Sequence, residues 1–262
     1  METTKDATTL PDAPPRAERL LSKVPEVTLG FWFIKIIATT LGEVGGNAVT
    51  MSMNLGYLVG SLIFGVPLIL AVIVQIRYRR FHPGIYWATI TLTTLAGTTL
   101  ADFFDRSLGI GYFGGSVSLF SLVLVSLGVW RMSTGSVDIQ TVITPKAEAF
   151  YWLTIMFSQT LGTALGDWMA DRTPLGYNGS AALIGVVLVV LAALYFLTKV
   201  SHTFLFWAAF ILTRPLGATL ANSMDKPVAQ GGLAISDVTA SGVLALAMVV
   251  CLLVIPQRQG HH

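Results

Sequence analysis

Five ionisable side chains lie inside long apolar runs of this 262-residue chain: Lys35, Glu43, Asp102, Asp167 and Arg214. A charge near the middle of a lipid bilayer costs at least about 2.5–3.5 kcal/mol, so such side chains are expected to face one another or a polar pathway. Carboxylate, amide and hydroxyl oxygens are suitable ligands for Mg²⁺, Mn²⁺ or Ca²⁺, whereas imidazole and thiolate suit Zn²⁺ or copper. These residue types therefore indicate hard-cation binding, charge pairing, or both.

The ionisable side chains recur at matching positions of four similar segments. Aligning the segments on Asn47, Asp102, Asp167 and Asn222 and stepping back four residues gives Glu43, Thr98, Thr163 and Ala218. Further steps give Thr39, Thr94, Gln159 and Arg214, and then Lys35, Ile90, Ile155 and Phe210. Residues four apart share one helix face, so each segment carries a polar stripe, and four stripes can line one axis. An alternative alignment pairs Glu43 with Asp102 through a four-residue insertion, about one helical turn, and keeps Glu43 on the same stripe.

A pair of small residues, four positions apart, lies beside each stripe. The pairs are Gly42 with Gly46, Gly97 with Ala101, Gly162 with Gly166, and Gly217 with Ala221. Small residues at this spacing let helix backbones approach closely in lipid. We expect these pairs to pack the four stripe-bearing helices against one another.

The composition is that of a membrane protein. The chain is 53% hydrophobic and 11% charged, with a mean hydropathy of +0.70, whereas soluble domains carry about 25% charged residues. Runs long enough to cross a bilayer are predicted at 29–53, 57–77, 85–105, 111–131, 148–170, 178–198, 203–225 and 234–255. We predict an all-α membrane protein whose eight transmembrane helices form four parallel two-helix repeats, with pseudo-rotational symmetry about the membrane normal.

The predicted segments are a flexible tail (1–26), repeat 1 (27–80), repeat 2 (81–132), repeat 3 with a leading loop (133–199), repeat 4 (200–256) and a C-terminal tail (257–262). Most basic residues flank the spans on the side of the two tails, and only Arg106, Arg172 and Lys226 fall on the other side. Basic residues favour the cytoplasm, so both termini are predicted to be cytoplasmic. Four tryptophans near the starts of the odd spans are interpreted as interface anchors: Trp32, Trp87, Trp152 and Trp207.

The chain resembles a bacterial family of integral membrane proteins that is defined by a fourfold repeat of unknown function, of the DUF347 type. The residues that carry the resemblance are KIIATTLGE from Lys35 to Glu43, Asp102, Asp167 and TRPLGATLAN at 213–222. The resemblance covers roughly 27–255 and implies an eight-span protein of the bacterial inner membrane, but no activity. Asn47 and Asn222 stand where the other two repeats have aspartate, which makes a shared site asymmetric.

Our leading hypothesis is a small secondary transporter for a hard divalent cation such as Mn²⁺, coupled to protons. The predicted ion-binding residues are Glu43, Asn47, Thr98, Asp102, Thr163, Asp167 and Asn222, with Glu43, Asp102 and Asp167 as metal ligands. Lys35 and Arg214 are assigned to gating or charge pairing, and Arg214 could instead contact an anionic substrate. Each of three aspartates at the outer helix ends precedes a basic residue, and these are predicted to line a vestibule or to cap solvated helix ends: Asp105, Asp171 and Asp225.

Two other classes of protein compete with the transporter. The buried charges could be purely structural, pairing Lys35 with Glu43 and Arg214 with Asp167, in a membrane sensor or scaffold that uses the loop at 131–147. An intramembrane enzyme is disfavoured because no Ser–His, His–Asp or HExxH set is present, and Schiff-base chemistry at Lys35 lacks an aromatic cage. We expect no enzymatic activity, no resident cofactor and no nucleic-acid partner; the expected partners are the bilayer, a small ion and further copies in a homo-oligomer.

Overall fold

The computed structural model describes residues 22–78 and 80–260, and this part of the chain forms eight long helices. Their bounds are α1 Leu29–Asn47, α2 Tyr57–Arg77, α3 Pro83–Asp102, α4 Gly111–Thr134, α5 Pro145–Arg172, α6 Gly176–Leu197, α7 His202–Asp225 and α8 Asp237–Val254. Short π-helical turns continue α1 over Ala48–Ser52 and α3 over Phe103–Ser107. Threonine side chains cap the N-termini of two stripe-bearing helices. In α1 the Thr28 hydroxyl accepts a hydrogen bond from the N–H of Phe31, and in α5 the Thr144 hydroxyl accepts one from the N–H of Ala147.

Five of these helices are long and apolar enough to cross a membrane: α2, α4, α6, α7 and α8. The chain is therefore a helical, multi-pass membrane protein with internal repeats. Helices α1, α3 and α5 are less apolar, because they contain the threonine, glycine and ionisable residues of the polar stripes.

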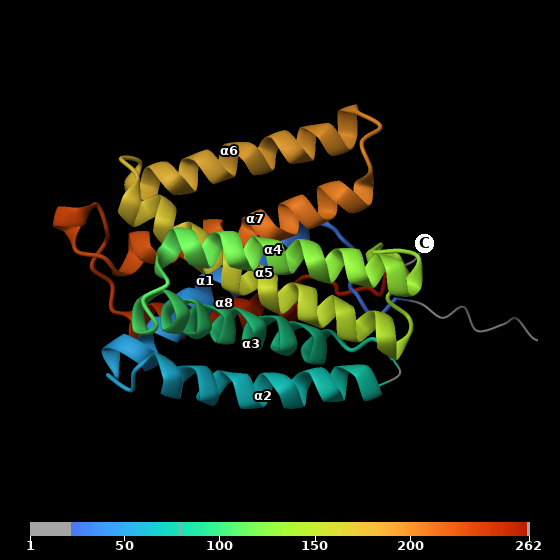
Figure 1. Cartoon of the computed structure of the whole chain (residues 1–262), viewed down its shortest axis with the longest axis horizontal. Helices are drawn as coiled ribbons and strands as arrows, with labels where there is room; N and C mark the ends of the chain where they lie inside the picture. The colour runs from blue at the N-terminus through green and yellow to red at the C-terminus, as the bar shows by residue number, and fades with distance from the viewer. Residues whose placement is uncertain (1–21, 79, 261–262) are drawn as a thin grey trace, which may run out of the picture.

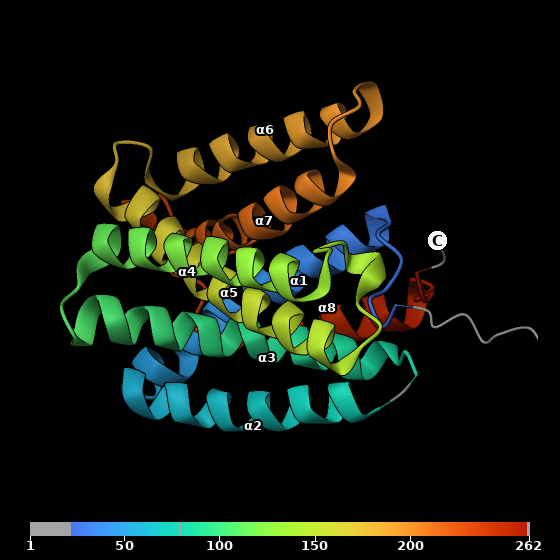
Figure 2. The same cartoon turned by 45° about the vertical axis from the view of Figure 1, so that its right-hand side comes forward.

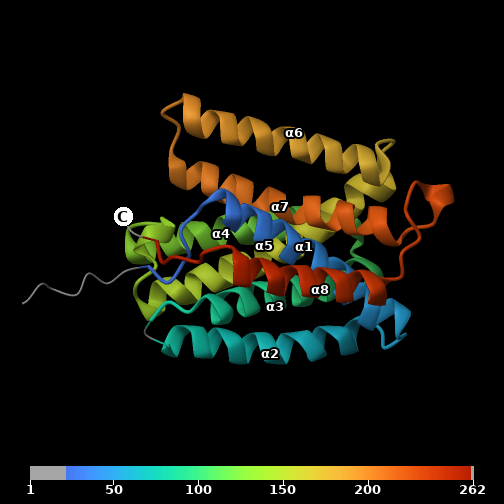
Figure 3. The ribbon, with the colours of Figure 1, turned by 180° about the vertical axis from the view of Figure 1, so that it is seen from behind.

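Four helices form an inner ring in which α1 packs on α3, α3 on α5, α5 on α7, and α7 back on α1. The other four cover this ring from outside: α2 lies along α3, α4 along α5, α6 along α7, and α8 along α1. Figures 1 and 2 show α2 and α6 on opposite sides of the bundle. Helix α4 lies towards the viewer in Figure 1, and α8 lies towards the viewer in Figure 3, which is seen from behind. Each outer helix thus packs on the inner helix of the following repeat. Large apolar side chains of the outer helices, such as Leu62 and Val189, are exposed, as a lipid-facing surface requires.

Close backbone contacts at one glycine of each repeat hold the inner ring together. A Cβ atom added at these positions would lie within 3.0 Å of a residue on the next inner helix. The pairs are Gly42 with Thr94, Gly97 with Gln159, Gly162 with Arg214, and Gly217 with Thr39. The predicted role of the small-residue pairs in packing the inner helices is confirmed, and the four contacts join stripe residues at one level of the axis.

One end of the bundle is closed by aromatic side chains and by both ends of the described chain. Trp87, Trp152 and Trp207 are buried in one core cluster there, so their interpretation as interface anchors is wrong. The indoles are buried because they pack against other aromatic and aliphatic side chains of this cluster, and Trp207 Nε1 still donates to the Val137 carbonyl at 3.0 Å. The segment 22–28 crosses this end, where Lys23 Nζ lies 2.6 Å from a Glu148 carboxylate oxygen.

Candidate functional site

The four polar stripes meet around one buried guanidinium, that of Arg214 on α7, whose exposure is 0%. Arg214 Nη2 lies 2.9 Å from Glu43 Oε2 on α1. The same nitrogen donates to Thr163 Oγ1 on α5 at 2.6 Å and to Thr98 Oγ1 on α3. Nη1 donates to the Thr39 carbonyl at 3.3 Å. We call Arg214, Glu43, Thr98 and Thr163 the Arg214 network, since it joins all four inner helices.

The pairing within this network differs from the sequence prediction. Glu43, Thr98 and Thr163 come together as the stripe alignment predicts, but Arg214 pairs with Glu43 rather than with Asp167. Arg214 belongs to the row one turn, about 5.4 Å, before that of Glu43, and its long side chain spans this distance. Glu43 is thereby occupied, and the predicted Lys35–Glu43 ion pair is absent from the described part of the chain.

A second ionic group lies at the C-terminal ends of the inner helices. Arg106 Nε lies 2.8 Å from Asp102 Oδ1, and Arg106 Nη2 lies 3.1 Å from Asp167 Oδ2. Asn222 Nδ2 donates to Asp167 Oδ1 at 3.3 Å. We call Arg106, Asp102, Asp167 and Asn222 the Arg106 cluster. It brings together one predicted residue from each of α3, α5 and α7.

Arg106 is the side chain of this cluster that the sequence does not assign to a site. In the sequence Arg106 stands as a basic residue next to an outer helix end, yet in the structure it bridges two buried carboxylates. Its signal is the four-residue spacing from Asp102, which places both on one helix face. Its side chain is 34% exposed, so the cluster has one side open to the surroundings.

Some buried oxygen atoms near this level have no hydrogen-bond partner within the described residues. These are Asn47 Oδ1, at the end of α1, and Asp102 Oδ2. Both residues are less than 4% exposed. Buried acceptors are rarely left without a donor, and such atoms often contact water or an ion.

The charges along the axis are unevenly distributed. The cations are the buried Lys35 and Arg214 and the partly exposed Arg106; the buried anions of the stripes are Glu43, Asp102 and Asp167, and Asp105 is buried just beyond them. The Arg106 cluster has two carboxylates for one guanidinium, which leaves one negative charge in excess when all are ionised. Lys35, at the other end of the stripes, has no carboxylate within 4.0 Å among the described residues. The axis is thus negative towards the C-terminal ends of the inner helices and positive towards their N-terminal ends.

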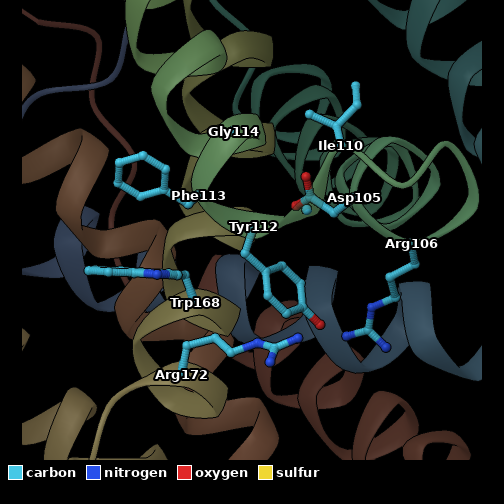
Figure 4. Close-up of a pocket in the computed structure, with 9 residues that line it drawn as sticks. Asp105, Arg106, Ile110, Tyr112, Phe113, Gly114, Trp168 and Arg172 are labelled. Atoms are coloured by element: carbon cyan, nitrogen blue, oxygen red, sulfur yellow. The ribbon is translucent and has the colours of Figure 1, made fainter.

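An open cleft of about 710 Å³ lies beside the Arg106 cluster and includes Arg106 in its lining. Asp105, Arg106, Tyr112, Trp168 and Arg172 are among its lining residues, and Figure 4 shows the Tyr112 ring between the two arginines. Arg106 and Arg172 lie 5.7 and 6.0 Å from the centre of this ring. Of the three predicted vestibule aspartates, Asp105 lines the cleft.

The other two predicted vestibule residues, Asp171 and Asp225, are not among the residues that line this cleft. Asp171 accepts from the Tyr177 hydroxyl at 2.9 Å, and Asp225 pairs with Lys226 Nζ at 2.9 Å. Burial lowers the pKa of Lys226, but the hydrogen bond and charge of Asp225 outweigh burial, so the pKa is raised. Both aspartates therefore stabilise local structure at the helix ends.

The three predicted metal ligands do not form one ready-made site. Within the described residues, no group of three or more His, Cys, Asp and Glu side chains is arranged to hold a metal ion. Glu43 is paired with Arg214, whereas Asp102 and Asp167 share Arg106. The prediction of a single three-carboxylate site is corrected accordingly: arginines divide the carboxylates between two levels of the axis.

Fold and site together define a multi-pass helical membrane protein in which internal repeats enclose a line of buried charges. The family described as Repeat of Unknown Function (DUF347) matches four segments of the chain, at 30–81, 85–136, 150–201 and 205–258. The chain therefore belongs to this family, as the sequence resemblance predicts, and each matched segment contains one inner and one outer helix. No curated protein and no solved structure matches the chain significantly.

Proposed function

We propose that this protein is a secondary transporter that moves a hard divalent cation, such as Mn²⁺, along the axis of the inner ring in exchange for protons. In this proposal all eight helices cross a bacterial inner membrane, as four parallel repeats related by rotation about the membrane normal. Both termini lie in the cytoplasm, and the cleft beside Arg106 opens on the outer side.

The Arg106 cluster carries the proposal. It combines an excess negative charge with a buried oxygen atom, Asp102 Oδ2, that lacks a donor in the described structure. Asn47, which occupies the same row on α1, has a second such atom, Oδ1. The candidate ligands are carboxylate and amide oxygens, which bind Mg²⁺, Mn²⁺ and Ca²⁺ in preference to softer metals. A net charge that needs compensation, next to oxygen atoms that need a partner, is what a cation would supply.

Arg106 is the group that the entering cation would replace. Its guanidinium holds Asp102 and Asp167, while its partly exposed side chain borders the cleft. When Arg106 swings towards the cleft, two carboxylates are freed for the ion, and Asn222 beside Asp167 adds an amide oxygen. When the ion leaves, Arg106 returns to the two carboxylates and one of them takes up a proton, because a single guanidinium balances only one of the two negative charges. This exchange couples the cation to protons.

The Arg214 network would then act as the gate. It joins the four inner helices beyond the Arg106 cluster, and its one carboxylate, Glu43, is held by Arg214. A passing cation must break this ion pair, with Thr98 and Thr163 offering hydroxyl oxygens on either side. Gating therefore requires Arg214 to exchange Glu43 for another contact.

The same ion pairs favour a second candidate, a membrane scaffold whose charges only fix the packing of the helices. Glu43, Asp102 and Asp167 each have an arginine partner, as a purely structural core requires. A scaffold gives no role to the excess charge of the Arg106 cluster or to its unpartnered oxygen, Asp102 Oδ2. Ion flux separates the two candidates.

The test is Mn²⁺ uptake into proteoliposomes that contain a fluorophore quenched by Mn²⁺. The wild-type protein should conduct Mn²⁺ above protein-free liposomes, and Asp102→Asn should reduce the rate at least about tenfold, since a ligand charge is lost. Glu26→Gln, at an exposed carboxylate, is the matched control and should keep the wild-type rate. Equal flux in wild-type, Asp102→Asn and protein-free liposomes would leave the scaffold as the answer.

A further inference from the structure

Three polar side chains towards the N-terminal ends of the inner helices lack partners in the described structure, although protein surrounds them completely. The unpartnered atoms are Lys35 Nζ, Gln159 Nε2 and Oε1, and Arg214 Nε. Each residue has an exposure of 0%. Leaving a buried polar group without a hydrogen bond is costly, so several such groups together indicate a missing ligand.

These side chains lie at adjacent levels of the same axis. Gln159 precedes Thr163 by one turn on one face of α5, and the Thr163 hydroxyl accepts from Arg214. Lys35 Nζ lies 4.0 Å from the centre of the Phe210 ring, and Phe210 precedes Arg214 by one turn on α7. Because residues four apart share a helix face, we expect the three side chains to point to the same stretch of the axis, between α1, α5 and α7.

The hydrogen-bonding capacity of this group suits an anion. Lys35 offers three N–H donors, Arg214 one at Nε, and Gln159 two, against a single amide oxygen as acceptor. The carboxylate nearest in the stripe, Glu43, is already bound by the other end of the Arg214 guanidinium. The row of Lys35 is otherwise apolar, with the buried residues Ile90, Ile155 and Phe210. In such surroundings the ring of Phe210 is the one group among the described residues that Lys35 Nζ is shown to contact, and an anion would stabilise the ammonium further.

The space between the helices limits the size of the anion. The backbones approach closely at the same level, where glycines Gly97 and Gly162 contact Gln159 and Arg214. Such close packing disfavours a polyatomic anion such as phosphate or a carboxylate. A halide ion needs only a spherical gap lined by donors.

We propose that Lys35, Gln159 and Arg214 bind one chloride ion on the axis, as a site separate from the proposed cation site. Chloride accepts hydrogen bonds from the Lys35 ammonium, the Gln159 amide and Arg214 Nε, and it provides the counter-charge that Lys35 lacks. It also holds Lys35 and Arg214 at adjacent levels despite their like charges. This inference does not depend on cation transport, since none of its three residues belongs to the Arg106 cluster.

The test compares thermal unfolding of the purified full chain in sodium chloride and in sodium gluconate at equal ionic strength. The unfolding midpoint should rise saturably with chloride, because a ligand that binds only the folded state stabilises it. Bromide should replace chloride, and gluconate should not. Identical midpoints at all chloride and gluconate concentrations would overturn the proposal and leave ordered water as the occupant.

Variants locate the site. Lys35→Met should abolish the dependence of the midpoint on chloride, and Gln159→Leu should raise the half-saturating chloride concentration at least about tenfold, the effect of losing a charge-assisted or buried hydrogen bond. The matched controls Lys199→Met and Gln140→Leu, at exposed positions, should respond as the wild type does. A wild-type chloride response in Lys35→Met would refute the assignment. If Lys35→Met fails to fold, Gln159→Leu decides, and an unchanged half-saturating concentration refutes the site.

Discussion

The buried ion pair between Glu43 and Arg214 makes a quantitative prediction about single and paired substitutions. Glu43 is 1% exposed and Arg214 is 0% exposed, so removing either charge leaves the other buried and uncompensated. Breaking such a pair from one side costs about 3–5 kcal/mol. Glu43→Gln and Arg214→Gln should therefore each lower the free energy of unfolding by about that amount.

The double substitution should be much less damaging than the two single changes suggest. With both residues replaced by glutamine, neither charge is buried alone, and two amides can bond to each other and to Thr98 and Thr163. We expect the double variant to lose no more than a single variant, about 3–5 kcal/mol, which implies a coupling free energy of at least about 3 kcal/mol. The pair Asp225 and Lys226, at the edge of the bundle, should show a coupling of only about 0–1 kcal/mol.

The assay is reversible unfolding of the purified protein by sodium dodecyl sulfate in mixed micelles, followed by circular dichroism. The four proteins of the cycle, the wild type, two single variants and one double variant, are measured under one condition. The reasoning is refuted if the single variants lose less than about 1 kcal/mol, or if the double variant loses the full sum of the two.

The remaining predictions concern helix packing and the closed end of the bundle. Gly162→Ala places a methyl group against the next inner helix and should lower the free energy of unfolding by about 1–3 kcal/mol in the same assay. In the control Gly185→Ala the methyl group points into open space, so the free energy of unfolding should stay within about 0.5 kcal/mol of the wild type. Equal stability of the two variants would contradict the contact. Glu148→Gln removes the carboxylate paired with Lys23 and should make the segment 22–28 more susceptible to limited proteolysis, whereas Glu26→Gln, at an exposed side chain, should leave its cleavage rate unchanged.

Much of the axis could be predicted from sequence because two local rules apply to it. Residues four apart share a helix face, and lipid does not tolerate stray charge. Together these rules identify Glu43, Thr98 and Thr163 as residues that meet, and they assign the small residues beside them to helix contacts. The family match follows from the same repeats.

The partners of the long side chains could not be predicted in this way. Row alignment treats a side chain as lying at the level of its own Cα atom, whereas the guanidinium of Arg214 reaches Glu43 one turn further along. Arg106 likewise turns back to Asp102 from beyond the predicted span. The burial of Trp87 depends on how neighbouring repeats close one end of the ring, and one repeat alone does not contain that information.

The central claim, that the Arg106 cluster takes up a divalent cation, is tested most directly by Mn²⁺ binding to the purified protein. Electron paramagnetic resonance measures free Mn²⁺ during a titration, and therefore the amount bound. The account predicts about one bound ion per chain, lost in Asp102→Asn and in Asp167→Asn while both variants keep the fold of the wild type. Binding no greater than in protein-free micelles, or unchanged binding in both variants, would contradict it.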